Sequence, residues 1–307
     1  LPFSVDSALD AHEETRLKYR YLDLRRPSLQ NNLVVRHRAA QAVRRYLDSE
    51  SFLEIETPVL TKATPEGARD YLVPSRVHPG QWYALPQSPQ IFKQILMISG
   101  LDRYFQIVRC FRDEDLRADR QPEFTQIDIE MSFCSQELVL ELSEGVLRSM
   151  WKNVLDYDIE EIPRLTYAES MTRFGVDNPD MRFAMEHVTL TDALRSSESN
   201  IISGAIQNGG IAKAMNVKNA AATTSRKVID GWTEFVRRYG MGGLMWGKVN
   251  EDGWSGPMGK LLSDAEKKEV GTQLNAEVGD VLLLGLGPAK AVHAGLGRLR
   301  AHLGKTL

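Results

Sequence analysis

The sequence has few cysteines, no long apolar run and no excess of charge of one sign, and each lack narrows the class of protein. Cys110 and Cys134 are the two cysteines among 307 residues; they support neither a disulfide framework nor a metal site, and we expect reduced core thiols. No apolar run is as long as a membrane span, so we expect no membrane partner. With 41 carboxylates against 38 lysines and arginines, any nucleic-acid contact must come from local basic patches.

The sequence also lacks a signal peptide and internal repeats, and it opens on Leu1 instead of Met. We therefore expect a processed or excised piece of a longer protein, whose targeting this piece does not reveal. A length of 307 residues allows more than one domain. The six histidines are scattered and form no Ser-His or Cys-His pair beside the polar motifs described below, so we assign no histidine a catalytic role.

Hydropathy patterns and end signals predict the elements of the first 155 residues. We expect helices at 32–49, 86–100 and 136–155, and strands at 52–58, 104–108 and 126–131. Ser88 is a good N-cap for the second helix, Pro89 suits its first position and Gly100 suits its end. The basic and aromatic run at 15–26 is either a solvated helix or a nucleic-acid contact.

The composition of the chain changes near residue 185. Residues 196–225 are rich in Ser, Asn, Gly and Ala, and glycines are dense at 240–259. We therefore divide the chain into a lead-in at 1–15, a first domain at 16–185 and a second α+β domain at 186–307.

The segment 110–124, CFRDEDLRADRQPEF, places arginines and carboxylates between two expected strands. Arg112 at the end of the first strand can grip a phosphate through two parallel hydrogen bonds. The adjacent acids Asp113 and Glu114 can orient this arginine or recognise a base or a ribose.

The rest of this hairpin reaches further from the sheet. Arg117 and Arg120 lie in the loop, where a mobile guanidinium could meet pyrophosphate or a nucleic-acid backbone. Phe124, where the chain re-enters the sheet, could stack on a flat base. The alternative is a solvated hairpin tip, because each of these residues alone is more often structural than functional.

The second strand alternates apolar and polar residues, so its two sets face opposite sides of the sheet. The apolar set, expected in the core, is Ile127, Ile129, Met131 and Phe133; the polar set is Gln126, Asp128, Glu130 and Ser132. Acids and amides beside an arginine-rich hairpin suggest the floor of a pocket. The alternative is an ordinary exposed sheet face.

Two neighbouring segments add polar groups that suit an amino-acid ligand. The loop at 61–71 is free to close over a ligand, and its Glu66 could take an amine. Gln90 and Lys93 share one face of the second helix, where Lys93 could read a carboxylate. The alternative is a surface helix that happens to carry one lysine.

Five strings in the sequence carry a resemblance to a known family. They are FRDEDLRADRQPEFTQID at 111–128, FLEIETPVL at 52–60, RYLDLRR at 20–26, TPEGARD at 64–70 and LPQSPQIFK at 85–93. The first two resemble the second and first motifs of class II aminoacyl-tRNA synthetases. The other three are similar to the aspartyl-tRNA synthetases of the bacterial and organellar type. The resemblance is dense from residue 16 to 133 and looser beyond 182.

The resemblance implies an α+β fold in which an antiparallel sheet flanked by helices is the platform of the active site. Residues 16–185 would be the first part of the catalytic domain, and 186–307 an inserted α+β domain of the GAD type. The resemblance also implies a homodimer joined through the first motif and Pro58. The compartment would be a bacterial cytoplasm or the mitochondrial matrix.

The reaction implied by the resemblance is the ATP-dependent activation of L-aspartate to aspartyl-adenylate, followed by transfer to tRNA(Asp). Arg112 would be the catalytic residue, holding the α-phosphate. The residues implied at ATP are Arg112, Asp113, Glu114, Gln121 and Phe124, and those at aspartate are Glu66, Ser88, Gln90, Lys93, Arg112 and Asp128. Arg117 and Arg120 would meet pyrophosphate or the tRNA acceptor end. Mg²⁺ is expected with ATP, held by ligands outside this chain.

The chain departs from the family pattern in two places. We find no counterpart of the third motif and no N-terminal anticodon-binding barrel, so we expect the central portion of a longer protein, with weak or no adenylation by these 307 residues alone. Two other functions remain open: a non-catalytic module that binds tRNA or another partner, and an ammonia-using asparagine synthetase of the same fold.

Overall fold

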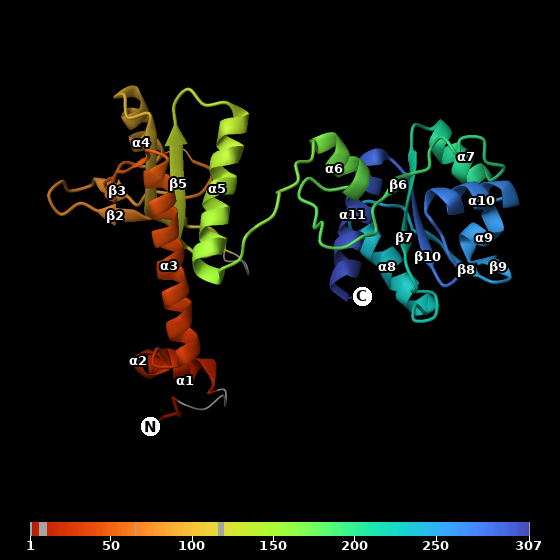
Figure 1. Cartoon of the computed structure of the whole chain (residues 1–307), viewed down its shortest axis with the longest axis horizontal. Helices are drawn as coiled ribbons and strands as arrows, with labels where there is room; N and C mark the ends of the chain where they lie inside the picture. Colours follow the sequence, from red (N-terminus) through yellow and green to blue (C-terminus); the bar gives the residue numbers. More distant parts are fainter. Residues whose placement is uncertain (1, 6–10, 65, 116–119, 307) are drawn as a thin grey trace. The chain divides into compact units, whose positions relative to one another are not determined.

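The computed structural model describes residues 2–5, 11–64, 66–115 and 120–306. The chain divides into two compact units, Leu1–Ile162 and Pro163–Leu307 (Figure 1). No helix among the described residues is long and apolar enough to cross a membrane. The α+β fold class expected from the sequence is confirmed, because both units combine helices with sheets.

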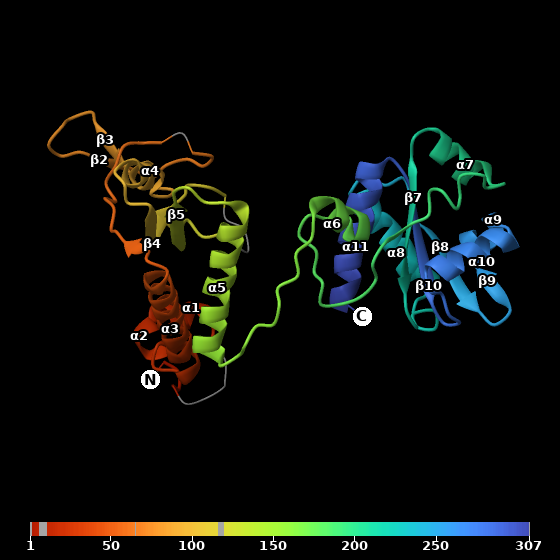
Figure 2. The same ribbon diagram turned by 45° about the horizontal axis from the view of Figure 1, so that its top comes forward.

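The first unit is built on two long helices and a small sheet. Its helices are α1 Glu13–Lys18, α2 Arg20–Asp23, α3 Pro27–Ser49, α4 Gln90–Ile98 and α5 Gln136–Leu155, and its strands are β1 Leu53–Glu54, β2 Leu72–Pro74, β3 Trp82–Ala84, β4 Arg103–Phe111 and β5 Glu123–Met131. The helices α3 and α5 lie side by side (Figures 1 and 2). Their apolar faces form a core with one face of the sheet, through Val43, Leu47, Phe52, Phe105, Leu142 and Val146.

The larger sheet of the first unit has the order β1-β4-β5, with β1 parallel and β5 antiparallel to β4, and β2 and β3 form a separate antiparallel pair. Phe105 pairs with Ile129 on the face that meets the helices, and Gln106 pairs with Asp128 on the opposite face. The predicted alternation is therefore confirmed over the second half of the strand, but Ile127, expected in the core, is 42% exposed. It was wrong for Phe133, which lies beyond the end of β5 with φ of 54° and is 98% exposed.

The basic run at 15–26 forms the short helices α1 and α2 around one buried acid. Asp23 is completely buried and forms ion pairs with Arg16 at 3.0 Å, with Arg26 at 3.9 Å and with Arg20. Burial alone would raise the pKa of Asp23, but the hydrogen bonds and charges of Arg16 and Arg20 outweigh it and lower the pKa. These arginines therefore contribute to the fold of the N-terminal segment.

The second unit is a five-stranded antiparallel sheet between two layers of helices. Its strands are β6 Val188–Thr189, β7 Ile211–Val217, β8 Met245–Asn250, β9 Gly253–Ser255 and β10 Val281–Gly287, and its helices are α6 Tyr167–Phe174, α7 Asn200–Gln207, α8 Arg226–Arg237, α9 Pro257–Leu261, α10 Asp264–Gln273 and α11 Ala289–Thr306. The strand order is β6-β7-β10-β8-β9. In the central strand β10, Val281 and Leu283 enter the core with α8 and α11, whereas Leu282 and Leu284 enter the other core.

A buried arginine shows that residues 180–185 belong to the second unit. The division falls after Ile162, whereas the composition suggested a boundary after residue 185. Arg300 on α11 is 2% exposed, and its guanidinium donates to the carbonyl oxygens of Asp180, Phe183, Ala184 and Met185 at 2.7, 2.6, 2.9 and 3.2 Å. These bonds tie the segment before residue 186 to α11, so it folds with the second unit. The roles assigned to the two domains stay predictions.

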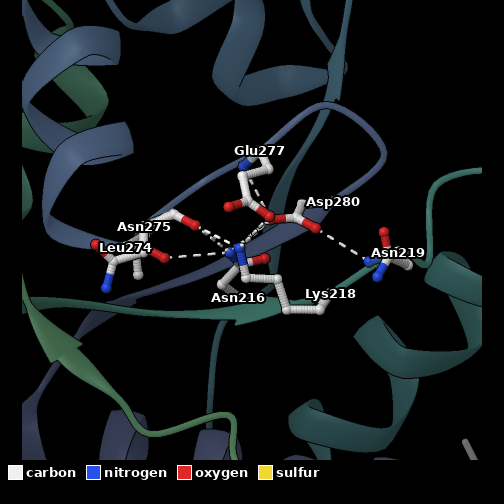
Figure 3. A network of polar contacts seen from close by, with 7 residues as sticks. All are labelled: Asn216, Lys218, Asn219, Leu274, Asn275, Glu277 and Asp280. Carbon is white, nitrogen blue, oxygen red and sulfur yellow. Dashed lines mark hydrogen bonds and ion pairs between the residues drawn. The ribbon is translucent and has the colours of Figure 1, made fainter.

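A polar network fixes the turn that leads into β10 (Figure 3). The buried carboxylate of Asp280 accepts hydrogen bonds from Asn216 Nδ2 at 2.8 Å, from the amide of Asn219 at 3.0 Å and from the amide of Glu277 at 2.9 Å. Lys218 Nζ lies 3.0 Å from the same carboxylate. The network therefore joins the end of β7 to the start of β10.

Candidate active site

A cavity of about 570 Å³ opens in the first unit beside the β4–β5 hairpin. Four segments supply its walls: the loop before β2, the segment between β3 and α4, the end of β4, and the return into β5. The residues that line it are Glu66, Gly67, Ala68, Gln87, Arg112, Glu114, Asp115, Arg120, Gln121, Pro122 and Phe124. The structure thus brings the charged hairpin and the polar loop, which are far apart in the sequence, to one cavity.

The hairpin wall places a cation over an aromatic ring. The Arg112 amide donates to the carbonyl of Pro122 at 2.9 Å, which continues the pairing of the strands past their ends. The Arg112 guanidinium lies over the Phe124 ring, 4.9 Å from its centroid. Arg120 Nη1 is 2.9 Å from Glu114 Oε2. A guanidinium with one face on a ring keeps its N–H groups free to point at an anion.

The opposite wall presents the carboxylate of Glu66. Its Oε2 accepts a hydrogen bond from Ser88 Oγ at 3.2 Å, and its Oε1 accepts one from Thr64 Oγ1 at 3.3 Å. The expectation that Ser88 caps α4 was wrong, because Pro89 is the N-cap. The Ser88 hydroxyl is directed at Glu66 instead.

A buried cation lies on the polar face of the sheet. Lys93 on α4 is 9% exposed, and its Nζ lies 2.9 Å from Asp128 Oδ1 and 3.1 Å from Glu130 Oε2. Burial alone would lower the pKa of Lys93, but these two carboxylates outweigh it and raise the pKa, so the lysine is an ammonium ion. The second oxygen of Asp128 is buried and has no hydrogen-bond partner among the residues that the structure describes. A buried acceptor of this kind is suited to a donor brought by a ligand.

The thiol of Cys110 links the cavity to the buried lysine. Burial raises the pKa of Cys110 to about 11; the negative charges of Asp128 and Glu66 add to this rise, and Arg112 and Lys93 oppose it. Charged residues of the cavity wall and of the cluster around Lys93 therefore both affect the pKa of one buried thiol. Cys110 is a core thiol as expected, whereas the expectation was wrong for Cys134, which lies beyond β5 and is exposed.

Several of the residues predicted from the sequence occupy separate places around this site. Glu66, Arg112, Glu114, Arg120, Gln121 and Phe124 line the cavity, while Lys93, Asp128 and Ser88 make the contacts described above. Asp113 pairs with Arg69 and lines a smaller adjoining hollow. Gln90 is half-buried in the first turn of α4. Arg117 lies outside the described residues.

The structure adds two residues that were not among those predicted to contact a ligand. Glu130 is the second partner of Lys93, and its place in the alternating polar set was the available signal. Gln87 is 2% exposed, lines the cavity and bonds to the loop that carries Glu66. The sequence placed Gln87 inside the expected helix at 86–100, whereas α4 begins only at Gln90. Within the parts of the chain that the structure describes, no group of three acids, cysteines or histidines could hold a metal ion.

A family model and two curated proteins are similar in sequence to this chain. The model of the family described as tRNA synthetases class II (D, K and N) matches residues 12–270. The whole chain is 55% identical to an Aspartate--tRNA(Asp/Asn) ligase of Geobacillus sp. (strain WCH70) and 54% identical to an Aspartate--tRNA ligase of Macrococcus caseolyticus, and covers 52% of each. The chain thus spans about half the length of the curated relatives it matches.

A solved structure shows a weaker likeness. An aspartyl tRNA synthetase from Entamoeba histolytica is 23% identical, with a TM-score of 0.40 over 50% of this chain and 28% of that one. The family assignment rests on the family model and on the curated relatives.

Proposed function

Because the chain belongs to the class II (D, K and N) tRNA synthetases, we propose that it is the aspartate-activating part of an aspartate–tRNA ligase. The reaction joins L-aspartate to the α-phosphate of ATP and releases pyrophosphate; the aspartyl group then passes to tRNA(Asp). The relatives named as ligases of aspartate support this substrate. Full activity belongs to the complete natural protein, because the chain spans about half of those relatives.

The proposed substrate rests on one observation, the burial of Lys93 between two carboxylates. A buried ammonium held by two carboxylates can exchange one of them for the side-chain carboxylate of aspartate. Asparagine would offer a neutral amide in that place and leave the ammonium less well paired. A site built round such a bond can discriminate by about 10⁴ or more.

The ammonium group of the amino acid has a set of acceptors nearby. The carboxylates of Glu66, which accepts a hydrogen bond from Ser88, and of Asp128 would receive it. Gln90, one turn before Lys93 on α4, would contact the aspartate side chain. This assignment is supported by the buried oxygen of Asp128, to which no described residue donates a hydrogen bond.

The hairpin wall would bind ATP. Arg112 would hold the α-phosphate and the α-carboxylate of aspartate, which brings nucleophile and electrophile together. Phe124 would stack on adenine, and Asp113, Glu114 and Gln121 would contact the nucleotide. Arg120, now paired with Glu114, would turn to pyrophosphate or the tRNA acceptor end together with Arg117.

The chemistry needs position and charge, without a covalent enzyme intermediate. The aspartate carboxylate attacks the α-phosphorus, the bond to the bridging oxygen breaks, and pyrophosphate leaves with its electrons. Arg112 neutralises the charge that gathers on the phosphate oxygens. Mg²⁺ would accompany ATP as its counter-ion, and the described residues contain no group of three acids, cysteines or histidines that could hold it.

The proposal extends to assembly and place. We infer a homodimer joined near Pro58, and a second unit that acts as an insertion domain of the catalytic domain. The compartment would be a bacterial cytoplasm, in keeping with the source organisms of the relatives, or the mitochondrial matrix.

Aspartate-dependent exchange of pyrophosphate into ATP by the complete natural protein tests the proposal. We expect exchange with aspartate and at least about 10³-fold less with asparagine. Lys93→Met should raise the KM for aspartate by at least a hundredfold, and Lys152→Met, which removes a lysine from the surface of α5, should leave it unchanged. Unaltered aspartate binding by Lys93→Met would refute the assignment of the side-chain reader.

A further inference from the structure

One buried side-chain amide holds the stem of the loop that carries Glu66. Gln87 is 2% exposed and lies between β3 and α4. Its Nε2 donates to the carbonyl of Ala68 at 2.9 Å, and its Oε1 accepts from the amide of Ala68 at 3.1 Å. The amide thus pairs with both backbone groups of one residue, as a neighbouring strand would.

A second bond from Gln87 closes the loop at its other end. Its Nε2 also donates to Asp70 Oδ1 at 2.5 Å, while Asp70 Oδ2 accepts from the amide of Thr64 at 3.3 Å. Asp70 and Gln87 together therefore join the two ends of the segment 64–70. Glu66 lies within the segment that they close.

We propose that Gln87 is a positioning residue for the amino-acid subsite: it holds Ala68 against the cavity so that Glu66 stands ready to receive the ammonium group of the substrate. This inference rests on the proposed function. Gln87 acts through the loop, because its donors and its acceptor are engaged by Ala68 and Asp70. Without these bonds the loop samples other positions, and the ligand must order it on binding.

Gln87→Leu tests the proposal in the complete natural protein. Leucine fills the buried position with a side chain of similar size, but it cannot form any of the three hydrogen bonds. We expect the KM for aspartate in pyrophosphate exchange to rise by about ten- to a hundredfold, with the KM for ATP changed less than about threefold. Gln94→Leu on the exposed face of α4 is the matched control and should change neither value. An unchanged KM for aspartate in folded Gln87→Leu overturns the proposal.

A charge swap provides a second test that does not depend on an apolar substitution. Gln87→Glu places a carboxylate against Asp70, so it should weaken aspartate binding more than Gln87→Leu does. Adding Asp70→Asn restores one donor facing one acceptor, and we expect the double variant to recover at least about fivefold of the loss. If the double variant is folded but recovers nothing, the proposed contact between Gln87 and Asp70 does not position the loop.

Hydrogen exchange separates this inference from the proposed function. Gln87→Leu should speed exchange of the Ala68 amide at least about tenfold, whether or not aspartate is the substrate. If the unsubstituted protein fails to exchange pyrophosphate with aspartate, the proposed function falls, and the Ala68 amide alone then decides whether Gln87 holds the loop. Unchanged exchange of the Ala68 amide in Gln87→Leu refutes the claim that Gln87 holds the loop.

Discussion

Buried cations in the two units are held by different partners. In the first unit, Lys93 lies between the carboxylates of Asp128 and Glu130. In the second unit, Arg300 donates to four backbone carbonyls, and Lys213, which is 1% exposed, donates to the carbonyl of Met171 at 2.8 Å and faces His293 Nδ1 at 3.0 Å.

The kind of partner distinguishes a buried cation that stabilises the fold from one that can bind a ligand. Backbone carbonyls are held in place by the fold and cannot be exchanged for groups of a ligand. Arg300 and Lys213 therefore stabilise the second unit itself. A carboxylate can be replaced by another carboxylate of similar charge, so Lys93 can change partners. The pKa values follow the same division: burial lowers the pKa of Lys213 to about 8, whereas the two acids raise that of Lys93.

The largest effect is expected at Arg300. Arg300→Met removes four hydrogen bonds and the contacts of the guanidinium with the rings of Phe174 and Phe183, at 4.7 and 4.2 Å from their centroids. We expect a loss of roughly 3–5 kcal/mol of unfolding free energy, measured by urea denaturation. Arg298→Met, on the exposed side of the same helix, should lose less than about 0.5 kcal/mol. Equal losses in the two variants would contradict the role of Arg300.

A pH-dependent effect is expected at Lys213. Its folded pKa of about 8 lies below its ordinary value of 10.5, so the unfolded chain binds the proton more strongly. The stability of the second unit is therefore complete above pH 10.5 and falls as the pH is lowered toward 8, by about 3 kcal/mol. Denaturation at several pH values measures this slope.

Substitution of Lys213 isolates its share of the slope. Lys213→Met should flatten the dependence between pH 8 and 10.5, and the exposed Lys227→Met should keep it. A second loss toward acid pH should persist in both, because burial lowers the pKa of His187 to about 3. A slope that survives in Lys213→Met would show that another group causes it.

A smaller change is expected when one acid is taken from Lys93. Glu130→Gln leaves Asp128 in place and reduces the competition that the aspartate side chain meets. We expect aspartate to bind about two- to fivefold more tightly by calorimetry, with less than about 1 kcal/mol change in stability, since the Glu130 side chain is 33% exposed. Weaker binding would place Glu130 among the groups that hold the ligand.

The smallest effect concerns the two thiols. Cys134 is exposed, and Cys110 is buried with its pKa raised to about 11. Iodoacetamide at pH 8 should modify Cys134 within minutes and leave Cys110 intact in the folded protein, as mass spectrometry of the peptides would show. Comparable labelling of both would mean that the polar face of the sheet is open to solvent.

Local patterns in the sequence predicted the long elements well. The helix at 136–155 and the two strands around the hairpin were expected because alternation and helical periodicity run over many residues there. The left-handed Gly100, with φ of 83°, follows the end of α4 as expected. Phe133 was misplaced because the period of two continues past the point where the strand stops.

The site could be predicted only in part, because its contacts join distant segments. The charged hairpin identified Arg112, Glu114 and Phe124 as candidates, and the structure places all three at one cavity. The bond of Gln87 to Ala68 spans 19 residues and leaves no periodic signal. The start of the second unit was missed for the same reason, since Arg300 is more than 100 residues from the carbonyls that it binds.

The alternation of β10 between two cores has a consequence for how the second unit loses its structure. Leu283 contributes to one core and Leu284 to the other, so neither layer of helices can detach without exposing this strand. The two layers should therefore melt as one cooperative transition, and the amides of β10 should be the last to exchange with deuterium. A strand of seven residues thereby makes two cores a single thermodynamic unit.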